Sequence, residues 1–74
     1  MVHSWEEIDN ILLTNPNHIL STRPRLMYTL SCGRLGYHPH SNKEIAKIFN
    51  LSESRVSALT KQATLAITEH LNNK

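Results

Sequence analysis

The sequence is poor in cysteine, glycine, proline and aromatic residues, and it has no long hydrophobic run. Its one cysteine, Cys32, has no partner for an intrachain disulfide, which favours a reducing compartment. No apolar run approaches the roughly 18 residues of a membrane-spanning helix. Residues 1–4 lack the basic start and apolar core of a secretory signal. These absences predict a cytoplasmic protein without a membrane segment.

The chain has 74 residues, which is enough for one small domain, expected to span residues 1–74. A single core of this size supplies only about 3–5 kcal/mol of net stability, which favours an economical helical fold. Hydrophobic residues make up 39% of the chain, enough for a folded core. A wholly disordered chain is therefore not expected.

Charge is distributed unevenly along the chain. The first 20 residues hold three acids and no lysine or arginine, whereas residues 21–64 hold seven basic residues and two acids. The basic part predicts an affinity for a polyanion such as a nucleic acid. A solvated surface of mixed charge would have the same composition, so charge alone leaves both interpretations open.

The first predicted helix covers residues 5–14. Ser4 and Glu7 match the S-x-x-E capping box, in which the two side chains satisfy free backbone N–H groups at a helix start. The helix is expected to end before Pro16, because the residue that precedes a proline avoids helical geometry. Trp5, on the apolar face of this helix, is more typical of a core residue than of a binding anchor.

A second helix is predicted from near Thr22 to near Cys32. Pro24 falls in its first turn, where a proline loses no intrahelical hydrogen bond, and Gly33 is a typical C-terminal cap. Cys32 is expected to be a small buried side chain. The residues expected to point inward are Leu26, Met27 and Leu30. The next segment, up to residue 40, has the composition of a loop.

Residues 41–70 match the helix-turn-helix arrangement, a short helix and a longer one joined by a tight turn. Ser41 and Glu44 form a second capping box. Asn50 is expected to end the short helix and Ser52 to cap the long one. The predicted fold class is therefore all-α, with four helices, a helix-turn-helix and no wing.

Apolar spacing assigns faces to these two helices. The short helix is expected to bury Ile45, Ile48 and Phe49. The long helix is expected to bury Val56, Leu59, Ala63, Ala66, Ile67, His70 and Leu71. Its opposite face carries Ser54, Ser57, Ala58, Lys61 and Leu65.

The segment from Ser41 to Ser57, S-N-K-E-I-A-K-I-F-N-L-S-E-S-R-V-S, resembles the helix-turn-helix in conserved region 4 of bacterial sigma factors. Its ending, E-S-R-V-S, is most similar to flagellar-type members. Upstream, L-S-T-R at residues 20–23 is similar to the family's L-T-x-R helix start, and Cys32-Gly33 falls where members often have Phe-Gly. Helix-turn-helix periodicity alone would also fit LuxR-type output domains, whereas the upstream match favours the sigma type.

The resemblance implies that the long helix enters the major groove of promoter DNA and that the first helices contact the flap of the RNA polymerase β subunit. Arg55 and Lys61 are the implied phosphate contacts. The residues expected at DNA are Lys43, Ser52, Glu53, Ser54, Arg55, Ser57, Ala58 and Lys61. Those expected at a protein partner are Trp5, Ile8, Leu12 and Leu65. Leu65, which falls outside the buried stripe, would contact a second copy or another transcription protein.

Two departures from the family pattern predict only modest affinity for DNA. Ser57 and Ala58 stand where housekeeping members have Arg and Gln. A serine hydrogen-bonds without discriminating between bases, and an alanine offers only an apolar contact, for instance to a thymine methyl group. Residues 64–73 contain no Lys or Arg, although the family often has basic residues there.

We therefore expect a transcription module that binds promoter DNA and RNA polymerase and regulates initiation. The alternative is a sigma-like or LuxR-like protein-interaction module with little or no sequence-specific DNA binding, acting on polymerase, a sigma factor or another copy of itself. A complete sigma factor also needs a domain that melts the promoter, for which the chain has no room. An excised domain, half of a split factor and a small regulator all stay open.

The sequence gives no sign of catalysis, a cofactor or a metal site. Cys32, His38, His40 and His18 lack a recognised ligand spacing. No nucleophile elbow, glycine-rich phosphate loop or H-E-x-x-H motif occurs. We expect a protein that is not an enzyme.

Overall fold

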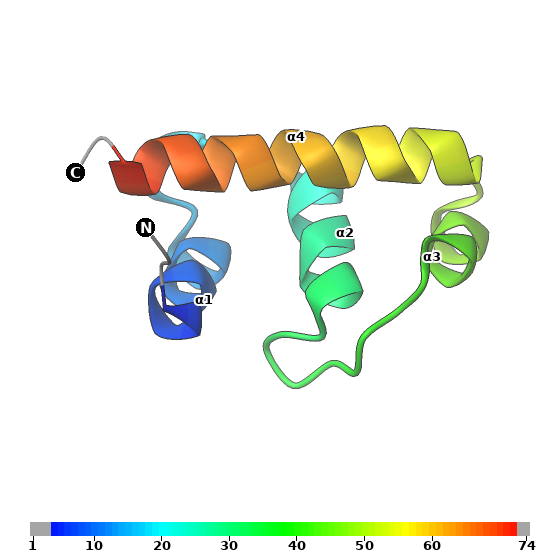
Figure 1. The fold of residues 1–74 in the computed structure, drawn as a ribbon, viewed down its shortest axis with the longest axis horizontal. Coiled ribbons are helices and arrows are strands. Elements are labelled where there is room, and N and C mark those ends of the chain that lie inside the picture. The colour runs from blue at the N-terminus through cyan, green and yellow to red at the C-terminus, as the bar shows by residue number, and fades with distance from the viewer. Residues whose placement is uncertain (1–3, 73–74) are drawn as a thin grey trace.

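The computed structural model describes residues 4–72, which form four α-helices and no strand (Figure 1). The helices are α1 (Trp5–Thr14), α2 (Thr22–Cys32), α3 (Asn42–Phe49) and α4 (Glu53–Asn72), with a short 3₁₀ helix, η1 (Pro16–His18), after α1. Within this range the all-α prediction is confirmed, and no helix is long and apolar enough to cross a membrane. Residues 1–3, where no secretory signal was expected, lie outside the described residues.

The helix boundaries follow the predicted capping residues. The Glu7 N–H donates to Ser4 Oγ (3.3 Å) at the start of α1, and the Arg55 N–H donates to Ser52 Oγ (3.1 Å) at the start of α4. At the other ends, Gly33 and Asn50 adopt the left-handed conformation (φ 66° and 56°) that closes α2 and α3. Local chemistry therefore fixes where these helices begin and end.

The capping box of α3 is reciprocal. The Glu44 N–H donates to Ser41 Oγ (3.2 Å), and the Ser41 N–H donates to the Glu44 carboxylate (3.0 Å). This hydrogen bond from the Ser41 backbone lowers the pKa of Glu44. The start of the helix-turn-helix is thus held by two side chains within one turn.

Replacing Ser41 by alanine is expected to cost about 1 kcal/mol of stability, because a side-chain cap is lost. For a domain of this size that loss lowers the melting midpoint by about 4–8 °C, measured by circular dichroism. Asn42→Ala is the matched control, since Asn42 follows the cap and is exposed. Equal losses from the two variants would contradict the capping role.

The other three α-helices all lie along one side of α4 (Figure 1). Its buried residues are Val56, Leu59, Ala63, Ile67 and Leu71. The first core cluster joins α1 and the segment after it to the C-terminal half of α4: Ile11, Leu12, Leu20, Tyr28, Ala63, Ile67 and Leu71. The second joins α3 to the N-terminal half: Met27, Ile45, Ala46, Val56 and Leu59.

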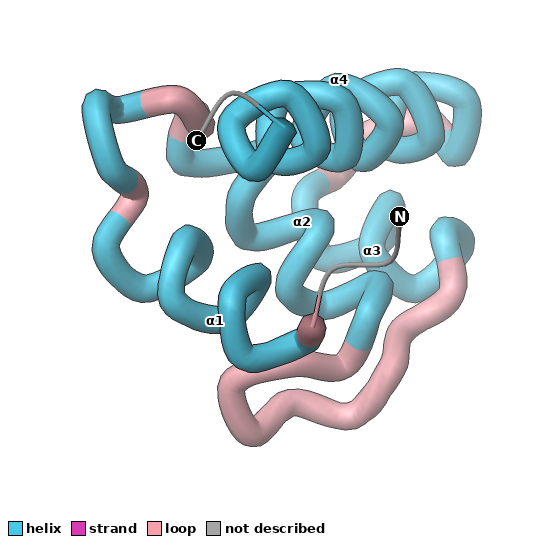
Figure 2. The backbone as a smooth tube through the Cα atoms, turned by 60° about the vertical axis from the view of Figure 1, so that its left-hand side comes forward, coloured by secondary structure: helices cyan, strands magenta, loops and turns pink. Residues whose placement is uncertain are grey.

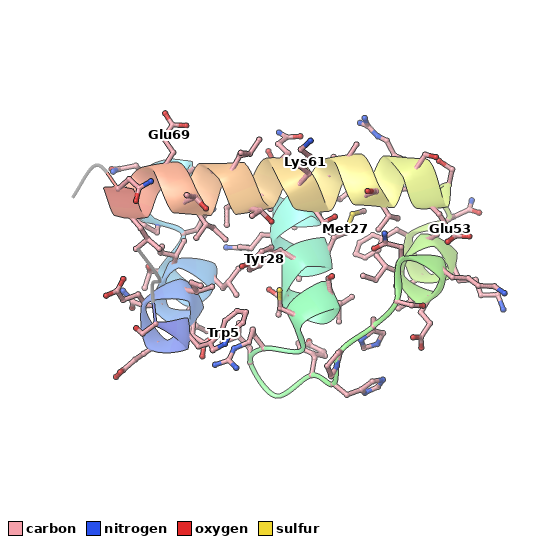
Figure 3. All side chains as sticks on the ribbon, in the orientation of Figure 1. Trp5, Met27, Tyr28, Glu53, Lys61 and Glu69 are labelled. Carbon is pink, nitrogen blue, oxygen red and sulfur yellow. The ribbon has the colours of Figure 1, made fainter. Side chains whose placement is uncertain are left out.

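Helix α2 joins the two clusters through adjacent residues. Tyr28 belongs to the first cluster and Met27, which is completely buried, to the second. Burial raises the pKa of Tyr28 from its ordinary value of 10.0 to about 12. Both side chains lie below α4 in Figure 3, on its packed side.

Two residues that were expected in the core lie at the surface. Leu26 is 40% exposed and Ile48 is 58% exposed, so the prediction that both point inward was wrong. The sides of these helices that face the core are instead occupied by Pro24, Met27, Tyr28 and Thr29 on α2 and by Ile45 and Ala46 on α3. Leu30, Phe49, Ala66 and His70, also expected inside, are partly buried.

Polar contacts stabilise the connection between α1 and α2. Asn15 ends α1 in the left-handed conformation, and its side-chain amide exchanges two hydrogen bonds with the backbone of Leu20 (2.9 and 3.0 Å). The longer connection, from Gly33 to Ser41, is the predicted loop. Figure 2 shows this loop running along the side of the molecule opposite α4.

Candidate nucleic-acid interface

The α3–turn–α4 unit has the geometry of a helix-turn-helix. Ile45 and Val56 are completely buried against each other's helices in the second core cluster, which fixes α4 on α3. The turn is closed by the left-handed Asn50 and by the Leu51 N–H, which donates to the Ala46 carbonyl (2.9 Å). The start of α4 is therefore fixed on α3 by the buried Ile45 and Val56 and by the backbone of the turn.

The outer face at the start of α4 is open to solvent. All of the residues predicted to lie at DNA are exposed: Lys43, Ser52, Glu53, Ser54, Arg55, Ser57, Ala58 and Lys61. Except for Lys43, which lies on α3, they belong to the first turns of α4 or to its cap. Lys43, Ser52 and Glu53 line one surface hollow along α3 and the turn, and Arg55 lines a different hollow, between α2 and α4.

Basic side chains flank α4 on both sides of its N-terminus. A surface hollow of about 460 Å³ lies between the starts of α2 and α4 and is lined in part by Arg23, Arg55 and Gln62. A second hollow, of about 410 Å³, follows α3 and the turn and is lined in part by Lys43 and Lys47. The arrangement places positive charge on two sides of the α4 N-terminus, which suits two lines of phosphates. Glu53 adds one negative charge to the second hollow.

Sequence reasoning did not assign Arg23 and Lys47 to this surface. Both are exposed and line the flanking hollows. Arg23 lies in the L-S-T-R segment that resembles the sigma-factor helix start, so that match was an available signal. Lys47 follows Lys43 by one helical turn, a spacing that places both on one side of α3.

Arg34 does not belong to the basic surface, although it was counted in the basic part of the chain. Its Nε donates to Asp9 Oδ1 (2.9 Å), and its Nη2 donates to Asp9 Oδ2 (2.7 Å). The guanidinium carbon also lies 4.7 Å from the centre of the Trp5 ring. Arg34 therefore ties α1 to the loop after α2, and Asp9 neutralises its charge.

The Asp9–Arg34 pair should make the stability of the fold sensitive to acid. Hydrogen bonding to Arg34, with its positive charge, holds the pKa of Asp9 below the ordinary value of 3.8. The stabilisation is fully present above that ordinary value and is lost as the pH falls through the lowered pKa. Between about pH 5 and pH 2, we expect the melting temperature to fall more steeply for the wild type than for Asp9→Asn. Parallel melting curves would contradict a stabilising pair.

The residues predicted to contact a protein have mixed environments. Leu12 is only 3% exposed and belongs to the first core cluster, so its assignment to a partner surface was wrong. It is buried because α1 packs against the C-terminal half of α4. Ile8 is partly buried against the same cluster. Trp5 is half-exposed beneath Arg34 and not in the core, whereas Leu65 is 60% exposed, outside the buried stripe as its spacing predicts.

Between residues 4 and 72, no three His, Cys, Asp or Glu side chains are grouped as they would be around a metal ion. His38 and His40 instead stack on each other, with ring centres 4.3 Å apart. The His40 ring also places Nδ1 2.7 Å from the His38 carbonyl oxygen. Cys32 packs partly buried against the first core cluster.

Comparison with protein-family models, with curated proteins and with solved structures gives no match for this chain.

Proposed function

We propose that the chain is a transcription module, similar to sigma-factor region 4, that binds promoter DNA through α3 and α4 and contacts RNA polymerase. The observation that carries this proposal is the exposed, hydroxyl-rich start of α4, which packs on the buried Ile45 and Ala46 of α3 and is flanked by lysine and arginine. An α-helix fits the width of the major groove, so the first turns of α4 can enter it.

Within this proposal, the chemistry of each side chain decides whether it contacts bases or phosphates. Ser54, Ser57 and Ala58 face the base edges, whereas Arg55 and Lys61 reach phosphates. Because the base-facing side chains are short and uncharged, binding is mostly electrostatic and weakly selective. Glu53 supports the α4 N-terminus through the helix dipole but repels phosphate, which keeps the affinity modest.

A pull-down from bacterial lysate combined with a gel shift on promoter fragments tests both parts of the proposal. The tagged chain is expected to recover RNA polymerase and to retard the fragments at low salt. Recovery of polymerase without a shift would support the alternative, a protein-interaction module. Failure of both assays would contradict both DNA binding and the contact with RNA polymerase.

The alternative is favoured by one specific observation, the exposure of Leu65 in a stretch of α4 without basic residues. If a transcription protein packs on this stretch, Leu65→Lys should abolish its recovery in the pull-down. The helical circular dichroism should not change, because Leu65 is outside the core. Gln62→Lys, an equally charged change at another exposed position of α4, is the matched control. Undiminished recovery with Leu65→Lys would remove this residue from the partner surface.

A further inference from the structure

The segment that joins α1 to α2, residues 15–21, is a short hinge with a strained backbone. Three of its residues, none of them a glycine, have positive φ: Asn15 (44°), Asn17 (55°) and His18 (53°). Left-handed conformations are costly for residues other than glycine and persist only where surrounding contacts hold them. Figure 2 shows the hinge at an outer edge of the molecule.

Pro16 adds to the strain at Asn15. A residue that precedes a proline prefers an extended backbone, because the proline ring clashes with it in helical geometry. Asn15 instead has φ 44° and ψ 60°, and the two hydrogen bonds between its side-chain amide and the Leu20 backbone hold it there. In an open, extended hinge these hydrogen bonds would be exchanged for hydrogen bonds to water, and the backbone strain would be relieved.

Helix α1 can leave its site as a unit. It contributes two buried side chains, Ile11 and Leu12, to the first core cluster, and the Asp9–Arg34 ion pair holds it to the loop after α2. The second core cluster joins α2, α3 and α4 and, among the described residues, includes none from α1. Undocking of α1 is therefore a local opening that leaves the helix-turn-helix intact.

Undocking of α1 uncovers an apolar face on the C-terminal half of α4. The members of the first core cluster that remain there are Leu20, Tyr28, Ala63, Ile67 and Leu71. An α1 helix fits this face, since Ile11 and Leu12 fill it within one molecule. We propose that two copies exchange their α1 helices, so that each α1 packs on α4 of the other copy and Asp9 of each copy pairs with Arg34 of the other.

The closed molecule and the exchanged dimer differ in the hinge, because the contacts of α1 are the same in both. Each copy gives one α1 and receives one, so the exchange closes as a dimer about a twofold axis. A short hinge under strain favours such an exchange. Helix α3 lies at the other end of α4 (Figure 1), so the dimer keeps both copies of the surface proposed for DNA. The exchange goes beyond the proposed function and does not depend on it.

Sedimentation of the equilibrated full chain without DNA tests the dimer and the role of the hinge. Pro16→Ala is expected to raise the dissociation constant at least about tenfold, because it relieves the strain of the closed hinge in both copies. Pro39→Ala is the matched control, since Pro39 is exposed in the loop between α2 and α3, which is not exchanged. A wild type that is monomeric at about 1 mM would overturn the proposal, as would equal dissociation constants for the two variants.

A mixture of two charge variants tests whether α1 is the part that is exchanged. Asp9→Arg and Arg34→Asp each place like charges at the ion pair, in the single molecule and in the homodimer alike. Both side chains are partly exposed, so each variant is expected to keep its helical circular dichroism. Exchange of α1 between the two variants restores opposite charges at both pairs. The mixed dimer is therefore expected to be at least about tenfold tighter than either homodimer.

A mixture of Glu6→Arg with Arg25→Asp is the matched control. It changes the net charges in the same way at two other positions of α1 and α2. This mixture is expected to associate no more tightly than its two components alone. If the Asp9→Arg and Arg34→Asp mixture stayed monomeric where the wild type is dimeric, or if the control mixture associated equally tightly, the exchange of α1 would be ruled out.

Discussion

Replacing Met27 by alanine is expected to unfold most of the domain at room temperature. Met27 is completely buried in the second core cluster, next to Tyr28 of the first, so the cavity would open where the two clusters meet. A buried methionine replaced by alanine costs about 2–5 kcal/mol. That loss is similar to the roughly 3–5 kcal/mol of net stability available to a domain of this size.

Urea unfolding followed by circular dichroism measures this effect. Leu26→Ala is the matched control, because Leu26 precedes Met27 on the same helix and is partly exposed. Its expected cost is below about 1 kcal/mol, as for most surface substitutions. Equal unfolding midpoints for the two variants would contradict the core described for α2.

Arg55→Ala and Lys61→Ala are expected to weaken DNA binding for every sequence tested. Each removes one phosphate contact, so each should reduce the slope of log K against log salt by about 1. Fluorescence anisotropy with a labelled duplex at several salt concentrations gives both the affinity and the slope. The double variant is expected to reduce the slope by about 2.

Arg34→Ala is the matched control, because it removes the same charge from a side chain that is paired with Asp9. It is expected to leave the salt slope nearly unchanged. If Arg34→Ala reduced the slope as much as Arg55→Ala, net charge and not local contact would explain the binding. A change of sequence preference without a change of slope would contradict the phosphate assignment of Arg55 or Lys61.

The helix boundaries could be predicted from the sequence because their causes are local. Ser41 and Glu44 satisfy each other within one turn, and Gly33 and Asn50 close helices through their own backbone conformation. The exposed face of α4 was predictable for a similar reason, since helical periodicity separates it from the buried stripe.

The predictions that were wrong concern contacts between segments that are distant in sequence. Leu26 stays exposed because another side of α2 faces α4. The apolar pattern of α2 alone does not show which side that is. Leu12 is buried because α1 docks on the far end of α4. Arg34 and Asp9 are 25 positions apart in the sequence. A count of charges along the chain therefore treats Arg34 as an unpaired basic residue.

The most direct test of the DNA-binding surface is a two-dimensional ¹⁵N NMR titration of the full chain with a mixed-sequence duplex at low salt. Resonances from residues 52–61, together with Arg23, Lys43 and Lys47, are expected to shift, whereas those of α1 and the C-terminal half of α4 are not. Shifts concentrated in α1 or around Leu65, with the start of α4 unaffected, would contradict DNA binding through the helix-turn-helix.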